Sequence, residues 1–254
     1  MESVYNVGFY IISFFSVYIQ VFFLVTFFEK RKVLKMKVDD IVLEKYPTVT
    51  IAVPCYNEQT TLVRTVESLL ALEYPKDKLS IFLVDDGSTD NTWNVMQQFK
   101  GHENIQILQK ENGGKHTALN LALTKTDSEF FACLDADSFA HPLALLRMMK
   151  YYQADPTIMA VVSSIIVYQP KNILQKAQQV EYDQSVYNKK MLGLSGGIHV
   201  TPGPLSVFRK RVFDELGPYK KAHNTEDQEI ALRMQMHGYK IDHCPEACVY
   251  TMTP

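Results

Sequence analysis

Glu129-Phe-Phe-Ala-Cys-Leu-Asp-Ala-Asp-Ser138 joins a short apolar run to two closely spaced carboxylates. The run at residues 130–134 is too short for a helix and rich in aromatic side chains, so it predicts a buried strand of a parallel sheet. Along an extended backbone, residues two apart point to the same side, so Asp135 and Asp137 are expected to converge where this strand ends. Open α/β sheets bind their ligands at that end of the strands.

Two like charges held this close are costly unless a cation lies between them. A hard divalent ion with oxygen ligands meets that need, and such an ion often carries the phosphates of a nucleotide. The alternative interpretation is a solvated Asp-x-Asp turn, because the tripeptide is common. The surrounding chain favours the ion-binding interpretation.

Length and composition bound the class of protein. The chain has 254 residues, of which 46% are hydrophobic and 21% charged, with a formal net charge of -2. These values are typical of a globular protein with a sizeable core and exclude a disordered or collagen-like chain. The charge balance lacks the basic excess of a nucleic-acid-binding protein.

The four cysteines show no paired spacing and are interpreted as small core residues in a reducing compartment. They are Cys55, Cys133, Cys244 and Cys248. Cys244 and Cys248 with His243 would make one zinc cluster, which is a weak signal without a matching second pair.

The first segment has the character of a membrane anchor. Residues 3–28 contain no charged side chain. At ~1.5 Å per residue this helix would be ~39 Å long, which exceeds a hydrocarbon core of ~30 Å. Residues 1–30 are therefore predicted to be a transmembrane anchor. A signal peptide is disfavoured by the acidic start and the missing cleavage site, and a buried core helix is the remaining alternative.

Five basic residues follow within residues 30–37, and none precedes the apolar segment. By the positive-inside tendency, the rest of the chain is predicted to be cytoplasmic on a single-pass membrane protein. The basic cluster is also expected to contact anionic lipid head groups. Residues 31–47 are predicted to be a juxtamembrane linker, and residues 48–254 one domain.

That domain alternates between strand-like and helix-like patterns. Strands are expected at residues 48–54, 79–84, 105–108, 130–134, 158–167, 205–209, 239–243 and 247–251, and helices around residues 62–70, 93–99, 115–120, 142–152, 172–191, 211–216 and 226–238. The alternation predicts an α/β domain with a mostly parallel, doubly wound sheet. No Gly-x-Gly-x-x-Gly motif follows the first strand, so a dinucleotide-binding dehydrogenase is set aside.

Gly113, Gly114 and Lys115 open one of these helices. Free backbone N–H groups at a helix start, beside an ammonium group, predict a cradle for a diphosphate. A plain loop is the alternative. The spacing of a Walker A loop is absent, so a kinase or ATPase has little support.

Thr225 with Gln228 has the capping-box spacing of a helix start. Glu226 and Asp227 lie in the first turn, where the helix dipole favours carboxylates for structural reasons alone. A carboxylate fixed there would equally serve as a general base toward a bound hydroxyl. The Gly- and Pro-containing loop at residues 193–203 is expected to shape an acceptor channel, to act as a lid, or simply to connect two elements.

Five motifs in one order carry a family resemblance. They are Pro54-Cys-Tyr-Asn-Glu58, Val84-Asp-Asp-Gly-Ser-Thr-Asp90, Gly114-Lys115 with Ala118-Leu-Asn120, Asp135-Ala-Asp137 and Thr225-Glu-Asp227. Together they resemble glycosyltransferase family 2, and within it the membrane-bound processive synthases of cellulose, chitin, hyaluronan and poly-N-acetylglucosamine type. The resemblance implies a GT-A fold, which is a Rossmann-like fold of nucleotide-diphospho-sugar transferases. It also implies an inverting transfer from a UDP-sugar, UDP-N-acetylglucosamine or UDP-glucose above all, to a glycan or lipid-linked acceptor.

The resemblance further implies a role for individual residues. The donor-binding positions would be Pro54, Tyr56, Glu58, Asp86, Lys115 and Asp135. Asp137, with Asp135, would hold a Mg²⁺ or Mn²⁺ ion. Asp227 would be the catalytic base with Glu226 beside it, and Gly203 and Thr225 would border the acceptor.

The chain departs from the family pattern near its end. Processive relatives continue into a helix with a Gln-x-x-Arg-Trp motif and into further membrane helices, whereas the one tryptophan here is Trp93. The domain is therefore expected to be C-terminally truncated relative to the family. The alternatives to a polysaccharide-synthesising transferase are a nucleotide-sugar-binding subunit completed by a partner subunit and a transferase acting on polyprenyl phosphate.

Overall fold

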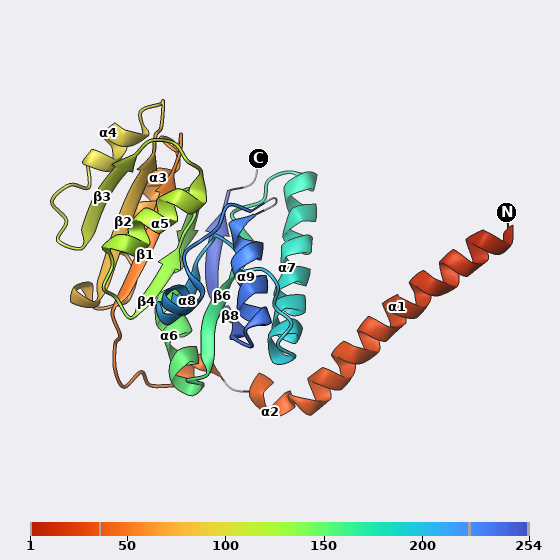
Figure 1. Ribbon diagram of the computed structural model, residues 1–254. Helices are drawn as coiled ribbons and strands as arrows, with labels where there is room; N and C mark the ends of the chain where they lie inside the picture. The colour runs from red at the N-terminus through yellow and green to blue at the C-terminus, as the bar shows by residue number, and fades with distance from the viewer. Residues whose placement is uncertain (1, 36, 223–224, 253–254) are drawn as a thin grey trace. The chain divides into compact units, whose positions relative to one another are not determined.

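Figure 1 shows the computed structural model, which describes residues 2–35, 37–222 and 225–252. The chain divides into two units, Met1–Lys37 and Val38–Pro254. The first unit contains α1 (Glu2–Glu29) and the short α2 (Arg31–Leu34). Asn6–Glu29 has a mean hydropathy of 2.2 and is, by length and composition, able to cross a membrane. The structure thus contains a helix where the anchor is predicted. The side of the membrane on which the second unit lies stays a prediction.

The second unit is built, within the described residues, on an eight-stranded sheet with the strand order β3-β2-β1-β4-β7-β6-β8-β5. The strands are β1 (Val49–Cys55), β2 (Leu79–Asp86), β3 (Ile105–Lys110), β4 (Phe130–Cys133), β5 (Ser138–Ala140), β6 (Ile158–Val167), β7 (Ser206–Arg209) and β8 (Lys240–Thr251). Strands β3, β2, β1 and β4 are parallel neighbours, as are β6 and β8, whereas β7 and β5 run antiparallel to the strands beside them. The prediction of an α/β domain with a mostly parallel sheet is confirmed.

Helices cover both faces of this sheet (Figure 1). They are α3 (Leu62–Leu70), α4 (Thr92–Gln97), α5 (Lys115–Lys125), α6 (Ala144–Ala154), α7 (Ile173–Leu194), α8 (Arg211–Leu216) and α9 (Glu226–Met236), with short 3₁₀ turns at Val38–Asp40 and Lys76–Lys78. Side chains of α3 and α6 belong to one core cluster, and those of α5 and α9 to the other. In β1, Val49 and Ile51 face the first cluster and Ala52 faces the second, as the alternation of a strand requires. A strand buried on both faces reads as a continuous apolar run, which is why this part was predictable.

Residues 38–47 are packed onto the second unit. Val38 is 1% exposed in the core. Arg147 on α6 donates from Nε and Nη2 to the two carboxylate oxygens of Asp39, each at 2.9 Å. The linker expected over residues 31–47 is therefore part of the compact unit from Val38 onward, because a bidentate pair and a buried apolar side chain fasten it to α6.

The last strands also differ in detail from the expectation. Two strands are predicted at residues 239–243 and 247–251, whereas β8 is one strand whose pairing with β6 shifts in register twice, the second time between Val162 and Ser164. The two predicted strands correspond to the two paired parts of β8. Strand β5 was missed because three residues carry too little periodicity to be recognised.

The packing of residues 38–47 predicts a difference between two substitutions. Val38→Asp places a charge in the core and should lower the free energy of unfolding by about 2 kcal/mol or more. Val42→Asp lies in the same segment at an 80% exposed position and should change it by less than about 0.5 kcal/mol. Thermal unfolding of both detergent-solubilised variants measures the difference. Equal midpoints would contradict the packed segment.

Candidate active site

A pocket of about 300 Å³, here called the strand-end pocket, opens at the C-terminal ends of the parallel neighbours β2, β1 and β4. Its lining residues are Pro54, Cys55, Tyr56, Glu58, Asp86, Lys115, Asp135, Ala136 and Asp137. Every residue predicted to bind the donor or the metal is among them. The reason is topological, because parallel strands present their carboxyl ends at one edge of the sheet. The structure brings these side chains together, and their individual roles stay predictions.

The two aspartates of the opening motif enter the strand-end pocket from a turn. Strand β4 ends at Cys133, and the N–H of Ser138 donates to the carbonyl oxygen of Asp135 at 3.1 Å. The extended backbone predicted for Asp135 to Asp137 is therefore wrong, although both side chains line the pocket. The chain turns here because the residues from Ser138 onward pair with β8 as strand β5.

Helix α3 holds this turn in place. Thr65 Oγ1 donates to the carbonyl oxygen of Ala136 at 2.8 Å, and Ser68 Oγ accepts from the N–H of Ala140 at 3.0 Å. Thr65 is 1% exposed, so its hydroxyl and the carbonyl that it meets are removed from water. Sequence reasoning missed both residues, since in the sequence they are ordinary polar positions of an amphipathic helix.

The carboxylate of Asp86, at the end of β2, is hydrogen-bonded to other groups of the protein. It accepts from Lys110 Nζ at 2.6 Å and from the N–H groups of Gly113 at 3.1 Å and Gly114 at 2.8 Å. The prediction that these N–H groups are free to cradle a diphosphate is wrong. They tie the loop to β2 instead, and this places Lys115 as the first residue of α5. Gly114 has a φ of +90°, which glycine adopts without strain.

Lys115 connects the strand-end pocket to the start of α9. Its Nζ lies 2.7 Å from Asp135 Oδ1, 3.4 Å from Glu226 Oε1 and 3.7 Å from Asp227 Oδ2. We call these four residues the Lys115 cluster. Burial disfavours the ammonium, but the surrounding negative charges, those of Asp135 and Asp227 among them, raise the pKa of Lys115 above its ordinary value. Lys115 is therefore a fixed cation at the centre of three carboxylates.

The start of α9 presents the two predicted catalytic carboxylates. Thr225 is the N-cap residue, and its Oγ1 accepts from the N–H of Gln228 at 3.3 Å, as the capping-box spacing predicts. The N–H of Gly203 donates to Asp227 Oδ2 at 2.9 Å. The two predicted acceptor positions, Gly203 and Thr225, thus both adjoin Asp227.

The pKa of Asp227 lies above the ordinary range of an aspartate. Burial raises the pKa of Asp227 to about 6, with the charges of Asp135 and Glu226 adding to the rise and Lys115 and the Gly203 N–H opposing it. A carboxyl group with such a pKa is ionised at neutral pH and is a stronger base than an ordinary aspartate. Asp227 is therefore suited to take a proton from a nearby hydroxyl group.

The loop before β7 closes over the Lys115 cluster because Gly203 lacks a side chain. A Cβ at this position would collide with the Asp135 carboxylate and the Lys115 ammonium. Thr201 fastens the same loop to α9 by donating its N–H and Oγ1 to the Asp227 carbonyl oxygen, at 3.2 and 3.0 Å. Sequence reasoning missed Thr201, which lies in no motif.

The side chains of the strand-end pocket suit a divalent cation that would be coordinated partly by the protein and partly by a bound anion. Among the described residues, no group of three or more His, Cys, Asp or Glu side chains is arranged to hold a metal ion alone. The pocket nevertheless has an excess of carboxylates. Burial raises the pKa of Glu58, and the charges of Asp137 and Asp135 raise it further. Asp137 is exposed and accepts a hydrogen bond from Ser138 Oγ at 2.9 Å, which leaves lone pairs of a hard oxygen ligand facing the pocket.

The alternative zinc cluster gains no support. Cys244 and Cys248 are free thiols, and His243 Nε2 lies 3.0 Å from Ser164 Oγ. The part of the chain that the structure describes contains no metal-binding group there.

Comparison with known proteins places this geometry in context. Residues 50–217 match the sequence profile described as "Glycosyl transferase family 2". The chain is 29% identical over 208 residues to a poly-beta-1,6-N-acetyl-D-glucosamine synthase of Staphylococcus epidermidis, covering 81% of this chain and 50% of that protein. The enzyme of the same name from Staphylococcus aureus strain COL is 29% identical over 220 residues, covering 86% of this chain and 53% of that one. The chain spans about half the length of the curated relatives it matches.

Solved structures show the same fold. A mannosyltransferase of Pyrobaculum calidifontis, in complex with GDP-Man and Mn2+, superposes with a TM-score of 0.73 at 24% identity and covers 92% of this chain and 65% of its own. S. aureus TarS 1-349, in complex with UDP-GlcNAc, superposes with a TM-score of 0.63 at 17% identity and covers 82% of this chain and 59% of its own. At these identities the likeness concerns the fold alone, which is the predicted GT-A type.

The Lys115 cluster predicts a pH-dependent stability change. Lys115→Met leaves three carboxylates without their cation, so the pKa of Asp227 should rise above about 6. A raised pKa lowers the free energy of unfolding at pH values where the Asp227 carboxyl is ionised. The variant should therefore lose about 2 kcal/mol of this free energy at pH 8 and clearly less at pH 5. Thermal unfolding at the two pH values measures this, with Lys125→Met, an exposed lysine of the same helix, as the matched control. A loss independent of pH would contradict the cluster.

Proposed function

Since this chain belongs to glycosyl transferase family 2, we propose that it transfers a sugar from a UDP-sugar to a hydroxyl group of a glycan acceptor, with inversion at the anomeric carbon. UDP-N-acetylglucosamine is the favoured donor. The sequence relatives are named as synthases of an N-acetylglucosamine polymer, and TarS was solved with UDP-GlcNAc. The reaction class is therefore one step of polysaccharide synthesis.

The observation that carries this proposal is the Lys115 cluster. One ammonium group contacts Asp135 of the strand-end pocket at 2.7 Å and lies 3.7 Å from Asp227, whose pKa is raised to about 6. A pocket suited to a nucleotide diphosphate and a carboxylate suited to be a base are thus held a few ångströms apart. An inverting transfer needs this pairing of a leaving-group site and a base.

The proposed reaction assigns each step to a residue of the chain. Asp227 takes the proton of the acceptor hydroxyl as its oxygen attacks the anomeric carbon, and the bond from that carbon to the diphosphate oxygen breaks. UDP departs with the bonding electron pair. Lys115 holds Asp135 and Asp227 in position, while Glu226 keeps the pKa of Asp227 high through its charge.

A Mg²⁺ or Mn²⁺ ion would be held by Asp137, with Asp135 nearby, and by the diphosphate of the donor. When bound it would neutralise the charge that grows on the departing diphosphate. The carboxylate excess of the strand-end pocket supports this assignment, because an anionic diphosphate enters such a pocket favourably only together with a cation. The mannosyltransferase of similar fold was solved with Mn2+.

We further propose that the enzyme is a single-pass membrane protein whose domain lies on the cytoplasmic side. Helix α1 supplies a span of sufficient length, and five basic residues lie within residues 30–37. The domain would then bind UDP-sugars on the cytoplasmic side of the membrane.

A second candidate is a nucleotide-sugar-binding subunit that transfers nothing until a partner subunit completes its acceptor side. The strand-end pocket alone would suffice for metal-dependent nucleotide binding, which is all that this candidate requires of the chain. Metal-dependent UDP binding without turnover by the purified chain, with turnover restored by membrane extract depleted of this protein, would identify the second candidate.

The base assignment predicts a selective loss of turnover. Asp227→Asn should lower the rate of UDP release by about 10²-fold to 10⁴-fold, because an amide accepts no proton, while UDP affinity stays within about twofold. In the unaltered protein the rate should rise with pH through about 6 and then level off, since Asp227 must be ionised. Steady-state release of UDP between pH 5 and 8 measures both, and Asp127→Asn at an exposed loop position is the control. Retained turnover in Asp227→Asn would eliminate Asp227 as the base.

The metal assignment predicts a change in nucleotide affinity. With Mn²⁺ present, Asp137→Ala should bind UDP at least about tenfold more weakly than the unaltered protein, which corresponds to about 1.4 kcal/mol. Without metal the two should bind UDP about equally. Isothermal titration calorimetry measures this, with Asp127→Ala as the matched control. If Mn²⁺ strengthened UDP binding equally in all three proteins, Asp137 would not be the ligand.

A further inference from the structure

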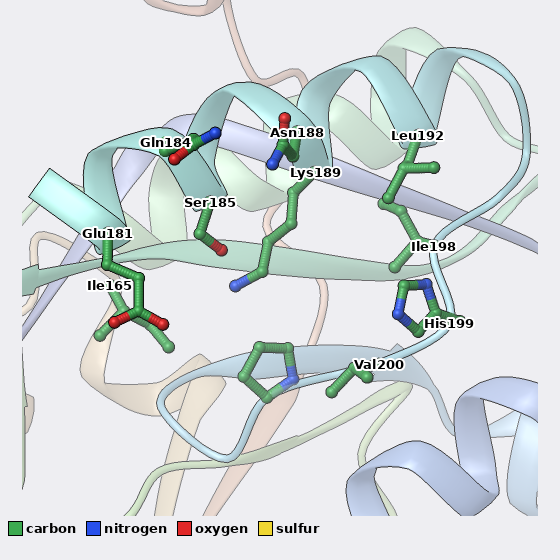
Figure 2. A pocket seen from close by; sticks show the side chains of 11 residues that line it. Ile165, Glu181, Gln184, Ser185, Asn188, Lys189, Leu192, Ile198, His199 and Val200 are labelled. Carbon is green, nitrogen blue, oxygen red and sulfur yellow. The ribbon is translucent and has the colours of Figure 1, made fainter. Parts of the chain in front are cut away.

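A second cavity, here called the helix-loop cavity, lies between α7 and the loop before β7 (Figure 2). Its volume is about 650 Å³, and it shares no lining residue with the strand-end pocket. Its walls are one side of α7, Ile165 of β6, and the loop residues Ile198, His199, Val200 and Pro202. It is the larger of the two cavities, and the proposed reaction does not use it.

Lys189 is the feature of this cavity that calls for a ligand. Its side chain leaves α7 and extends into the cavity (Figure 2). No described residue forms an ion pair or a hydrogen bond with its ammonium group. Burial lowers the pKa of Lys189 to about 8, so the group is still mainly charged at neutral pH. A partly desolvated cation without a partner is unfavourable, and an anion in the cavity would relieve this cost.

The neighbouring lysine shows the contrast. Lys190 points away from the cavity and is satisfied, because its Nζ donates to Tyr151 Oη at 3.0 Å and to the His243 carbonyl oxygen at 3.2 Å. Lys189 has no such structural task. Its charge is therefore available to a ligand.

The rest of the lining suits a polyhydroxylated ligand. Ser185, Gln184 and Asn188 supply a hydroxyl and two amides along α7. Glu181 lies at one end of the cavity, next to Ile165, on the side toward which the Lys189 side chain extends, and its exposed carboxylate would accept from ligand hydroxyls (Figure 2). One cation, one acceptor-only carboxylate, two amides and one hydroxyl match a ligand with one anionic group and several hydroxyls.

The helix-loop cavity shares a wall with the candidate active site. Val200 and Pro202 line the cavity, and Thr201 between them donates twice to the carbonyl oxygen of Asp227. The next residue, Gly203, donates to the Asp227 carboxylate at 2.9 Å. A ligand in the cavity therefore touches the loop that positions the base.

We propose that the helix-loop cavity binds the anionic group of a sugar acceptor, a phosphate monoester or a carboxylate, with Lys189 as its counter-ion. As an acceptor site this inference rests on the function proposed above, whereas as an anion site it rests on the cavity alone. The acceptor would then differ from a neutral N-acetylglucosamine chain by carrying an acidic substituent.

The test is a binding comparison on the full chain in detergent, with saturating UDP and Mn²⁺ to fill the strand-end pocket. The probes are N-acetylglucosamine 6-phosphate, glucuronic acid and neutral N-acetylglucosamine. The affinity of each probe is measured by ligand-observed saturation-transfer NMR. At least one acidic probe should bind about tenfold more tightly than the neutral sugar, and the more tightly bound probe identifies phosphate or carboxylate as the group.

Three variants assign that binding to Lys189. Lys189→Met should lose the tenfold preference, Lys189→Arg should keep it, and Lys176→Met, an exposed lysine of the same helix, should leave it unchanged. Equal binding of all three probes, or equal losses in Lys189→Met and Lys176→Met, would overturn the proposal. Should Lys189→Met fail to fold, loss of the preference in Lys189→Arg, judged by its own melting curve, would overturn it as well.

The same samples separate the two hypotheses. UDP affinity in the presence of Mn²⁺ reports on the strand-end pocket and should be equal in all four proteins. Acidic-sugar binding without UDP binding would keep the anion site and refute the proposed transfer. UDP binding and turnover without any preference for acidic sugars would support the proposed transfer and refute the anion site.

Discussion

One ammonium group holds together two parts of this domain that lie about ninety residues apart in the sequence. Lys115, at the start of α5, lies between Asp135 after β4 and the carboxylates of Glu226 and Asp227 at the start of α9. Three carboxylates gathered in a partly buried space would repel one another without it. The position of Lys115 depends in turn on Asp86, which ties the glycine loop before α5 to the end of β2.

The site draws on both helical layers of the fold. Helix α3, on one face of the sheet, holds the Asp135–Asp137 turn through Thr65 and Ser68. Helices α5 and α9, on the other face, supply Lys115 and Asp227. Helices α3 and α5 begin soon after the parallel strands β1 and β3, and so reach the edge where the parallel strands end, whereas α9 follows α8 and is joined to this edge through Lys115. The geometry of the pocket is therefore a consequence of the strand order.

The sequence predicted which residues meet, and it failed on how they are held. Strands β1, β2 and β4 are apolar runs followed at once by polar motifs, so their shared edge could be expected. The turn at Asp135 could not, because it depends on a three-residue strand that pairs with β8, far away in the chain. The same is true of the Gly113 and Gly114 N–H groups, whose acceptor lies on another strand. The local pattern of apolar and polar residues predicts which positions are buried and which element they form. The hydrogen-bond partner of a polar group depends on tertiary contacts, which a single sequence does not show.

The charges of the cluster also couple the two halves of the site. The pKa of Asp227 is raised by burial and by Asp135 and Glu226, and it is lowered by Lys115. A phosphate bound in the strand-end pocket would place negative charge beside Lys115, which lines that pocket, and would offset the influence that lowers this pKa. A bound donor would thereby make the carboxylate of Asp227 a stronger base. The same ammonium lies close to all three carboxylates and favours the ionised form of Asp227, so one cation both stabilises the cluster and lowers the pKa of the residue proposed as the base.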